Sequence, residues 1–402
     1  MPRYAGVKVR DMLRFQTAGE SHGLGLVAIL QGLPAGLRVD FDYVNRELKR
    51  RQGGYGRGGR MKIETDTAQF ISGVRHGQTI GSPISILIVN RDWENWKDAM
   101  AVEDTPESRA AHKALSRPRP GHADLPGCLK YNFHDARYVL ERASARETTV
   151  RVAVGALAKL FLKNFGVEVA SHVVALGEVS IADDHVPFEA VMALRDREDV
   201  MLACVDPDVE ARMKAVVDRA TENRDTVGGT FEVIVRGLPP GLGSCAQWDE
   251  RLDGQLAQAV MSIQAVKAVE IGSGIAGAAA MGSDVHDEIG YDRAHERFTR
   301  KTNRAGGLEG GITNGEDLVL RGYLKPISSL RRPLESVDFE SKETVKAAYE
   351  RSDICVLPAG GVVGESMVAI TLARSFLEKF GGDSMEETLR NFHAYREQVR
   401  KF

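Results

Sequence analysis

The sequence has few cysteines and no long hydrophobic run. Its four cysteines, Cys128, Cys204, Cys245 and Cys355, lie far apart and form no Cys-x-x-Cys pair. Neither a zinc site nor a disulfide framework is therefore predicted. No apolar run is long enough to cross a bilayer, and residues 1–11 lack the apolar core of a signal peptide. We expect a cytoplasmic protein that binds no membrane.

The chain also lacks an excess of charge of one sign. It has 53 Lys and Arg residues against 56 Asp and Glu residues in a length of 402. This balance gives no general attraction to nucleic acid, so any basic site must be local. What the sequence has in abundance is glycine, with 41 residues, many of them in clusters. Such clusters are typical of tight turns and of backbone that approaches a ligand closely.

The stretch from Arg142 to Glu147 predicts an anion site at the start of a helix. Ser144 and Glu147 have the spacing of a capping box, and the apolar residues that follow predict a buried helix. Arg142 and Arg146 then lie where the helix dipole is already positive, which is unfavourable unless an anion binds. Two solvated arginines that point apart are the alternative, and this stretch alone does not decide between them.

Two histidines lie in turns marked by glycine or proline. Residues 19–23 read Gly-Glu-Ser-His-Gly between two predicted strands, and His122 follows Pro-Gly close to Arg119. Near neutral pH, His22 and His122 can each donate or accept a proton. The pattern G-x-S-x-G around Ser21 is also that of the serine-hydrolase elbow, which needs a helix after the turn. A hydrolase is therefore the alternative hypothesis.

Several cations lie in segments rich in glycine or proline. Arg51 ends the predicted helix 40–51, and Arg57 follows it among five glycines. Arginine offers forked donors that suit phosphate or carboxylate. An RGG-like nucleic-acid segment is the competing interpretation, although the stretch is short and has one aromatic residue. The pattern recurs at Arg119, Arg142, Arg146, Lys325 and Arg351. Together these cations predict an enzyme that acts on a phosphate- or carboxylate-rich metabolite.

An internal repeat is visible in two pairs of motifs. They are Gly-Leu-Pro-Ala-Gly-Leu at 32–37 and Gly-Leu-Pro-Pro-Gly-Leu at 237–242, and Gly-x-x-x-Gly-x-Thr-x-Gly at 73–81 and 307–315. Each hexapeptide follows a predicted strand and precedes an amphipathic helix. We interpret this as a strand–helix–sheet unit duplicated within one chain, with halves at about 12–160 and 226–380.

Three further segments lead to structural expectations. Residues 272–277 match the dinucleotide fingerprint, but the charged stretch that follows cannot be the second strand of a Rossmann unit, so NAD binding is rejected. Residues 183–199 are charged and weakly patterned, which predicts a surface insertion. Residues 354–357 are predicted as a strand, and helices at about 364–380 and 384–399 close the chain.

Many of these motifs closely resemble those of chorismate synthases. They are G-E-S-H-G (19–23), G-Y-G-R-G (54–58), R-P-G-H-A-D (119–124), R-A-S-A-R-E-T (142–148), G-L-G-S (241–244), S-I-Q-A-V-K (262–267), N-R-A-G-G-L-E-G-G-I-T-N-G (303–315), K-P-I-S (325–328), R-S-D (351–353) and E-K-F-G-G-D (378–383). The resemblance covers nearly the whole chain from Met12 and leaves residues 1–11 as an N-terminal extension. It implies a single α+β domain over 12–402, a β-α-β sandwich with internal duplication that assembles as a homotetramer.

The resemblance also implies a reaction. Chorismate synthases catalyse the anti-1,4-elimination of phosphate from 5-enolpyruvylshikimate 3-phosphate to give chorismate, the last step of the shikimate pathway in aromatic amino acid biosynthesis. Reduced FMN is the obligatory cofactor, without net redox change, and the family is also associated with NADP. The chain has no visible flavin reductase domain, so we expect reduced flavin to come from a separate source. No metal and no nucleic acid are expected.

The resemblance assigns roles by matched position. His22 would protonate the departing phosphate, His122 would stabilise the reduced flavin near its N1 edge, and Asp353 would lie near flavin N5. The substrate-binding positions are Ser21, Arg51, Arg57, Arg119, Arg146 and Arg351. The flavin-contact positions are Arg142, Ala143, Ser144, Gln264, Ala265, Gly310, Lys325, Pro326, Ile327, Ser328, Ser329 and Arg351.

Overall fold

The structure is a computed structural model that describes residues 13–402 except 59–64, 183–185, 198–200 and 351–352. The predictions made for Arg351 and for the N-terminal extension therefore fall outside the described residues. Asp353 lies just inside them.

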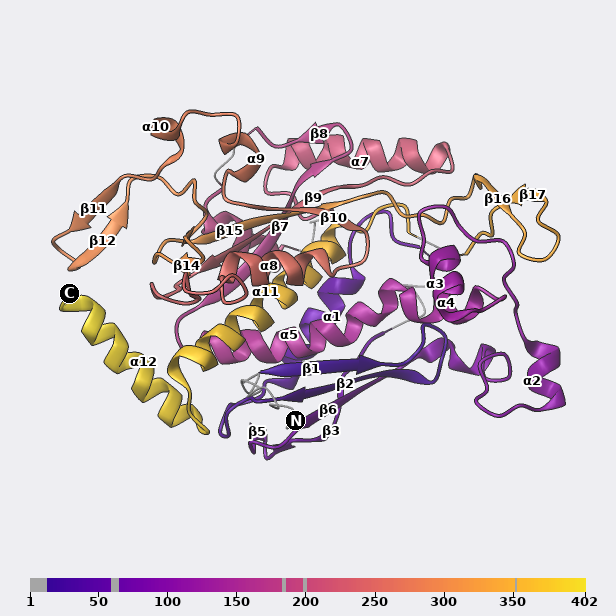
Figure 1. Ribbon diagram of the computed structural model, residues 1–402, viewed down its shortest axis with the longest axis horizontal. Helices are drawn as coiled ribbons and strands as arrows, with labels where there is room; N and C mark the ends of the chain where they lie inside the picture. Colours follow the sequence, from indigo (N-terminus) through magenta and orange to yellow (C-terminus); the bar gives the residue numbers. More distant parts are fainter. Residues whose placement is uncertain (1–12, 59–64, 183–185, 198–200, 351–352) are drawn as a thin grey trace, which may run out of the picture.

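Two antiparallel sheets enclose a layer of helices (Figure 1). The first sheet has the strand order β1 (Arg14–Ala18), β2 (Gly25–Gln31), β6 (Ile84–Val89), β3 (Gln69–Ser72). The second has the order β10 (Val266–Ile271), β15 (Leu318–Leu324), β9 (Gly229–Arg236), β7 (Glu168–Leu176), β8 (Val179–Ser180). The layer between them holds α1 (Phe41–Gln52), α5 (Thr148–Lys163), α8 (Leu252–Met261) and α11 (Leu357–Phe380). The predicted α+β class and β-α-β sandwich are confirmed.

The sequences of the helices in the middle layer explain where they begin and how they are buried. Asp40 caps α1, because its carboxylate accepts a hydrogen bond from the backbone N–H of Tyr43 at 2.8 Å. α11 is apolar all round and buried along almost its whole length, as expected for a helix with a sheet on one side and helices on the other. Gly364 lets α11 approach β9 closely, since a Cβ there would lie 2.5 Å from the ring of Phe231.

The paired motifs of the repeat fold alike. The hydroxyl of Thr79 donates to the carbonyl of Pro34 at 2.6 Å and accepts from the N–H of Leu37 at 2.9 Å. The hydroxyl of Thr313 makes the same two bonds to the second hexapeptide, at 2.7 and 2.9 Å. The sheets also match, since the pairing order β1-β2-β6-β3 corresponds to β7-β9-β15-β10. On this basis we propose that the halves predicted at about 12–160 and 226–380 are pseudo-duplicated, with the second half extended toward the N-terminus to include β7.

Two expectations about local structure were wrong. The segment before Leu357 is not a strand: α11 begins at Leu357, earlier than predicted, because Pro358 occupies its first turn and the glycines after it are packed rather than flexible. Residues 186–197 are not only a surface insertion, because some of their side chains are buried. They form α6 (Phe188–Ala193) and the 3₁₀ turn η4 (Leu194–Asp196), and the buried side chains of Phe188 and Val191 pack on the outer face of the second sheet.

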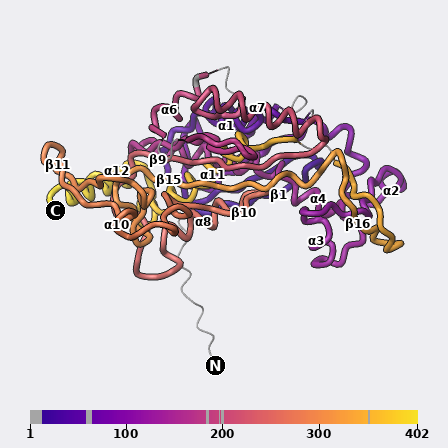
Figure 2. The backbone as a smooth tube through the Cα atoms, turned by 90° about the horizontal axis from the view of Figure 1, so that it is seen from above, coloured from indigo at the N-terminus to yellow at the C-terminus, as the bar shows by residue number. Residues whose placement is uncertain are grey.

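The smaller elements gather at the edges and ends of this sandwich. The helices are α2 (Pro106–Ala111), α3 (Asp124–Tyr131), α4 (Arg137–Ala143), α7 (Pro207–Glu222), α9 (Gly274–Gly277), α10 (Gly282–Val285) and α12 (Met385–Arg400), with 3₁₀ turns η2 (Arg91–Asn95) and η3 (Ala145–Glu147). The short strand pairs are β4 (Val74–Arg75) with β5 (Gln78–Thr79), β11 (Ile289–Asp292) with β12 (Arg297–Arg300), β13 (Leu308–Glu309) with β14 (Ile312–Thr313), and β16 (Glu335–Val337) with β17 (Thr344–Lys346). Figure 2 shows α12 and β11 at one end of the molecule and α2, α3 and β16 at the other.

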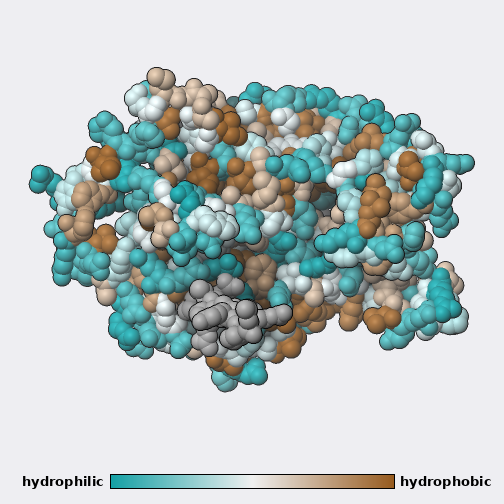
Figure 3. Space-filling model, viewed as in Figure 1, coloured by the Kyte–Doolittle hydropathy of each residue, from teal (hydrophilic) through white to brown (hydrophobic). Residues whose placement is uncertain are grey.

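The surface carries no continuous apolar belt on the face seen in Figure 3, where hydrophobic residues are interspersed with hydrophilic ones. Exposed apolar side chains include Leu129 on α3 and the pair Tyr291 and Phe298 on the β11–β12 arm. Within the described ranges, no helix has both the length and the apolar character needed to span a membrane.

Candidate active site

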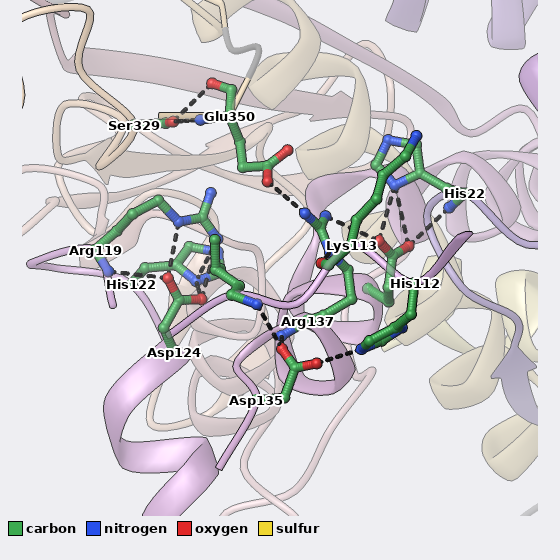
Figure 4. Close-up of polar contacts among 12 residues, drawn as sticks. His22, His112, Lys113, Arg119, His122, Asp124, Asp135, Arg137, Ser329 and Glu350 are labelled. Atoms are coloured by element: carbon green, nitrogen blue, oxygen red, sulfur yellow. Dashed lines mark hydrogen bonds and ion pairs between the residues drawn. The ribbon is translucent and has the colours of Figure 1, made fainter. Parts of the chain in front are cut away.

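The turn between β1 and β2 presents His22 to α4 (Figure 4). The imidazole Nδ1 lies 2.9 and 3.1 Å from the two carboxylate oxygens of Glu141, and the backbone N–H of His22 donates to the same carboxylate at 2.8 Å. Burial by itself raises the pKa of Glu141, but the hydrogen bonds from His22 and the charge of Arg137 lower it overall. The ionised carboxylate therefore holds the Nδ1 proton and leaves Nε2 as the nitrogen for proton transfer.

Ser21 lies inside the same turn and is almost fully buried. Its hydroxyl donates to the hydroxyl of Ser144 at 3.0 Å, and its backbone N–H donates to the carbonyl of Glu141 at 2.9 Å. The turn connects two strands that pair with each other, and no helix follows it. This arrangement is not a nucleophile elbow, so nothing in the geometry favours the hydrolase hypothesis.

The predicted helix start differs from the structure, because Ser144 caps the 3₁₀ turn η3 and not α5 itself. Arg142 does not lie at a helix start either: it is in the last turn of α4, where the helix dipole favours a cation. Ser144 precedes η3, which leads into α5, and its hydroxyl accepts from the N–H of Arg146 at 3.3 Å. The Glu147 carboxylate does not complete a capping box, because it accepts hydrogen bonds from Thr17 and Arg151 instead. The side chains of Arg142 and Arg146 diverge, as the alternative interpretation held. Arg146, however, is buried rather than solvated.

Two buried arginines meet at one aspartate behind this cap. Arg146 Nη1 lies 2.7 and 2.8 Å from the carboxylate oxygens of Asp66, and its Nε donates to Asn90 at 3.0 Å. Arg51 donates to the hydroxyl of Thr148 and to a backbone carbonyl, both at 2.9 Å. Its Nη1 is buried without a hydrogen-bond partner and lies 3.8 Å from the Asp66 carboxylate.

The charge of Arg51 is only partly compensated. Burial lowers its pKa to about 9, and the positive charges of Arg146 and Arg57 act in the same direction. Because a guanidinium stays protonated in proteins, such a shift means that the buried cation lacks enough negative charge around it. A bound anion would supply that charge.

The glycine-rich loop after α1 brings Arg57 to Asp353. Arg57 Nη1 lies 3.4 Å from one Asp353 oxygen, and the N–H of Gly58 donates to the other at 2.6 Å. Gly56 has a φ of 82°, and a Cβ there would lie 3.1 Å from the Cβ of Cys355. The glycine is thus needed for the loop to pack against the segment that carries Asp353.

A second histidine cluster lies at the start of α3 (Figure 4). His122 Nδ1 lies 2.5 Å from one oxygen of Asp124, and the guanidinium of Arg119 binds both oxygens at 2.8 and 3.0 Å. Burial alone raises the pKa of Asp124, but these hydrogen bonds lower it well below its usual range. Lys325 Nζ donates to the carbonyl of Gly121 at 2.8 Å, so the segment from Lys325 lies beside this turn.

A chain of polar contacts connects that segment with His22. The Ser329 hydroxyl donates to the carbonyl of Glu350 at 2.7 Å. The Glu350 carboxylate lies 2.8 Å from Arg137, and Arg137 lies 3.4 Å from Glu141 (Figure 4). The two histidine clusters therefore share one polar framework, although they come from distant parts of the chain.

Hydrogen bonds connect most of the positions that the resemblance predicts for flavin contact. The amide nitrogen of Gln264 donates to Glu147 at 3.3 Å, and the carbonyl of Ala265 accepts from the N–H of Lys325 at 3.0 Å. These bonds connect Arg142, Ala143 and Ser144 at the end of α4 with Lys325, Pro326, Ile327, Ser328 and Ser329. Gly310 does not belong to this connected group. It lies in the β13–β14 turn beside α8, and Figure 1 shows β14 well away from α3 and α4.

The structure thus brings together Ser21, His22, Arg51, Arg57, Arg119, His122, Arg146 and Asp353 with the connected group just described. The sequence did not indicate Glu141, Arg137 or Asp66 as site residues. An Arg and a Glu four residues apart on a helix normally form a surface pair, and no local signal separates this buried pair from an exposed one. In the part of the chain that the structure covers, no group of three or more His, Cys, Asp or Glu residues is placed to hold a metal ion.

Comparison with known proteins identifies the family of the chain. The chorismate synthase family matches residues 13–377. The chorismate synthase of Acidobacterium capsulatum is 62% identical over 396 residues, covering 97% of this chain and 100% of that protein. That of Geobacter sulfurreducens is 54% identical over 399 residues with the same coverage. A crystal structure of a chorismate synthase superposes with a TM-score of 0.78 at 42% identity, covering 97% of this chain and 99% of that one.

The sandwich and its two histidine–carboxylate clusters define an α+β enzyme with a polar, arginine-rich site. The chain belongs to the chorismate synthase family, and the enzyme is a lyase.

Proposed function

We propose that this lyase eliminates phosphate from 5-enolpyruvylshikimate 3-phosphate in the anti-1,4 sense to give chorismate, in the cytoplasm, with reduced FMN as cofactor. The observation that carries the proposal is the under-compensated buried charge of Arg51, which lies beside Arg146 and near Arg57. The substrate has one phosphate and two carboxylates, and a cluster of cations that lacks anions suits such a ligand.

The substrate would be held by Ser21, Arg51, Arg57, Arg119, Arg146 and Arg351. Of these, Arg146 and Arg119 already have a full carboxylate partner, Asp66 and Asp124 respectively. Both guanidinium groups are therefore fixed in orientation before a ligand arrives, which lowers the entropic cost of binding. Arg51 lacks such a partner and is the residue whose charge the ligand would complete.

His22 would donate a proton to the departing phosphate. The Glu141 carboxylate accepts a hydrogen bond from Nδ1 and fixes the ring, so Nε2 is the nitrogen from which a proton can be transferred. Phosphate is a poor leaving group as a trianion, and protonation at the moment of cleavage lowers the barrier. Arg137 keeps Glu141 in place and links it to Glu350.

The residues at the proposed flavin positions fit FMN. Gln264 has a buried side-chain oxygen without a hydrogen-bond partner, which suits a ring N–H donor. Lys325 and the hydroxyls of Ser328 and Ser329 suit polar and anionic groups, and His122 would lie near the N1 edge with Asp353 near N5. Reduced FMN, when bound, takes part in the elimination without net redox change. A separate protein or reductant would have to reduce the flavin.

We further propose that the enzyme is a homotetramer, as the family resemblance implies. Gly310 matches a flavin-contact position but lies away from the other positions in its own chain. Its contact would therefore be made to the flavin of a neighbouring subunit.

The test is an anaerobic assay of phosphate release from 5-enolpyruvylshikimate 3-phosphate with FMN and dithionite. Release with reduced flavin and none with oxidised flavin supports the proposal, whereas no release under either condition contradicts it. His22→Ala and His122→Ala should each lower turnover by about 10²-fold or more while FMN still binds. His295→Ala, at an exposed histidine on the β11–β12 arm, is the matched control and should leave turnover unchanged.

A further inference from the structure

The indole of Trp96 lies flat against the imidazole of His22. The two ring centroids are 4.0 Å apart, and the rings are inclined by only 26°. The Nζ of Lys113 lies 3.6 Å from the centroid of the same indole. A ring and an ammonium group at these distances cannot occupy one side of the indole, so Trp96 is enclosed between His22 and Lys113. The indole N–H donates to Asp92 at 3.1 Å.

Trp96 belongs to a segment that has little else to hold it in place. Between Asn90 and Leu115, both buried, none of residues 91–114 is buried. Several contacts of this segment with the body of the protein are made near its end. His112 Nε2 lies 2.5 Å from Asp135, and the carbonyl of Lys113 accepts from Arg137 at 2.9 Å (Figure 4). In the middle of the segment, Trp96 contacts the body of the protein by stacking on His22, and its ring centroid lies 5.6 Å from the guanidinium carbon of Arg137.

The stacking restrains a rotation of the imidazole that its hydrogen bond to Glu141 does not prevent. The hydrogen bond at Nδ1 fixes one edge of the ring but allows rotation about that edge. A flat aromatic neighbour opposes the rotation, because tilting the ring would lose the stacking contact. The indole also covers one face of the ring against water, and its negative face favours a cationic imidazole.

We propose that Trp96 is a positioning residue for His22, and that its indole fixes the plane of the imidazole for proton donation to the leaving group. The inference rests on the proposed function of His22. Trp96 itself has no contact with the reacting atoms. The charged groups around the pair are Glu141 and Arg137 on α4, with Glu350 behind Arg137, and Lys113 and Asp92 on the segment of Trp96.

The first experiment tests the contact in the resting protein, without substrate or flavin. The variant Trp93→Phe/Trp248→Phe leaves Trp96 as the one tryptophan of the three. Contact with a protonated imidazole quenches indole emission, so the emission should rise between about pH 5 and pH 8 if an imidazole lies against the indole. The rise should disappear when His22→Asn is added. An emission whose pH dependence is the same with and without His22 would overturn the proposal.

The second experiment tests the effect on the reaction. Trp96→Leu should lower kcat about tenfold while changing KM less than about twofold, because the donor loses its orientation but the substrate keeps its cations. A donor must be protonated, so kcat falls at high pH. Loss of the indole should move this fall toward lower pH, because a cationic donor loses its aromatic neighbour. Trp96→Phe retains a stacking ring and should lie between wild type and Trp96→Leu.

Two controls separate the possible failures. Trp93→Phe, on the same segment, should leave the pH profile unchanged, which distinguishes positioning from general disturbance of residues 91–114. If His22→Asn abolishes turnover but Trp96→Leu leaves kcat and its pH profile at wild-type values, the positioning role is wrong and the proposed function stands. If His22→Asn itself keeps normal turnover, the proposed function of His22 fails, and the fluorescence result alone then decides whether the contact exists.

Discussion

Arg50 and Arg51 are consecutive on α1, yet their guanidinium groups end in opposite electrostatic surroundings. Arg50 binds Glu365 at 2.7 and 2.9 Å and Glu47 at 2.9 Å. Burial alone lowers its pKa, but the two carboxylates raise it overall. Arg51 points into the proposed site, where its pKa is lowered to about 9. One residue thus stabilises the layer of helices, and the other is available for a ligand.

This contrast predicts opposite effects of the same substitution at the two positions. Without ligand, Arg50→Met should lower the free energy of unfolding by about 3–5 kcal/mol, because it leaves Glu365 buried with one partner fewer. Arg51→Met should change it by less than about 1 kcal/mol or raise it, because it removes a poorly compensated charge. Urea unfolding at pH 7 measures both. Equal destabilisation of the two variants would contradict this account of Arg51.

Arg51→Met should at the same time weaken substrate binding. A hydrogen bond from a charged donor to an anion is worth about 1.5–3 kcal/mol, so KM should rise at least tenfold. Lys379→Met is the comparison, since it removes a cation on α11 far from the site, where Lys379 lies over the ring of Tyr395. Its KM should equal that of the wild type.

The buried carboxylate of Glu365 predicts acid sensitivity of the fold. It is fully buried, bonded to Arg50, Ser171 and Arg195 and in contact with Lys159. Burial alone raises its pKa, but these cations lower it well below 4.5. Its folded pKa is below its unfolded pKa, so its contribution is complete above about pH 4.5 and is lost as pH falls through the lower folded value.

Glu365→Gln should therefore lower the free energy of unfolding at pH 7 by about 3–5 kcal/mol. The variant should also show a weaker loss of stability than the wild type as the pH falls below about 4.5. Urea titrations at a series of pH values give both quantities. If the two proteins lose stability in parallel in acid, the carboxylate is not the group responsible.

Glu141→Gln tests the electrostatic partner of His22. Glutamine can still accept a hydrogen bond from Nδ1, so the ring keeps its geometry but loses the favourable charge. The high-pH fall of kcat should therefore move toward lower pH, because the neutral amide no longer stabilises a proton on the donor. Glu397→Gln, at an exposed carboxylate on α12, should leave the profile unchanged. A profile that does not move in Glu141→Gln would show that the carboxylate does not control the donor.

The repeat predicts equal energetic roles for two distant threonines. Thr79 and Thr313 are buried, and each satisfies a backbone N–H and a backbone carbonyl of its hexapeptide. Thr79→Val and Thr313→Val should each cost about 1–3 kcal/mol, because each leaves a buried donor and acceptor unpaired. The two values should agree within about 0.5 kcal/mol, and the double variant should be additive. Clearly unequal costs would argue against equivalent environments.

Patterns among residues close together in the sequence were enough to predict much of this structure. The cap at Asp40, the strands around residues 19–23 and the paired hexapeptides all depend on neighbours in sequence, and the structure confirms each. The strand expected before Leu357 was wrong because an apolar run beside prolines and glycines suits a strand or a packed helix equally well. The resemblance to a family supplied the β-α-β sandwich, which periodicity alone does not specify.

The site was predictable as a set of residue types but not as a geometry. The prediction that Arg142 and Arg146 lie at a helix start was wrong for Arg142, and it did not give their directions, which depend on Thr17, Asn90 and Asp66 from other elements. Nothing local in the sequence singles out Trp96. Its neighbour across the stack is 74 positions earlier in the chain, and no local pattern encodes such a contact.

The shared layer of helices has a consequence for how the protein unfolds. The buried apolar residues of both sheets belong to one continuous cluster that runs through α1, α5, α8 and α11. Neither half contains a complete interior, because each sheet is covered by helices that the other sheet also needs. Although its length would allow two domains, the chain should lose its structure in a single cooperative transition, with neither half persisting as a folded intermediate.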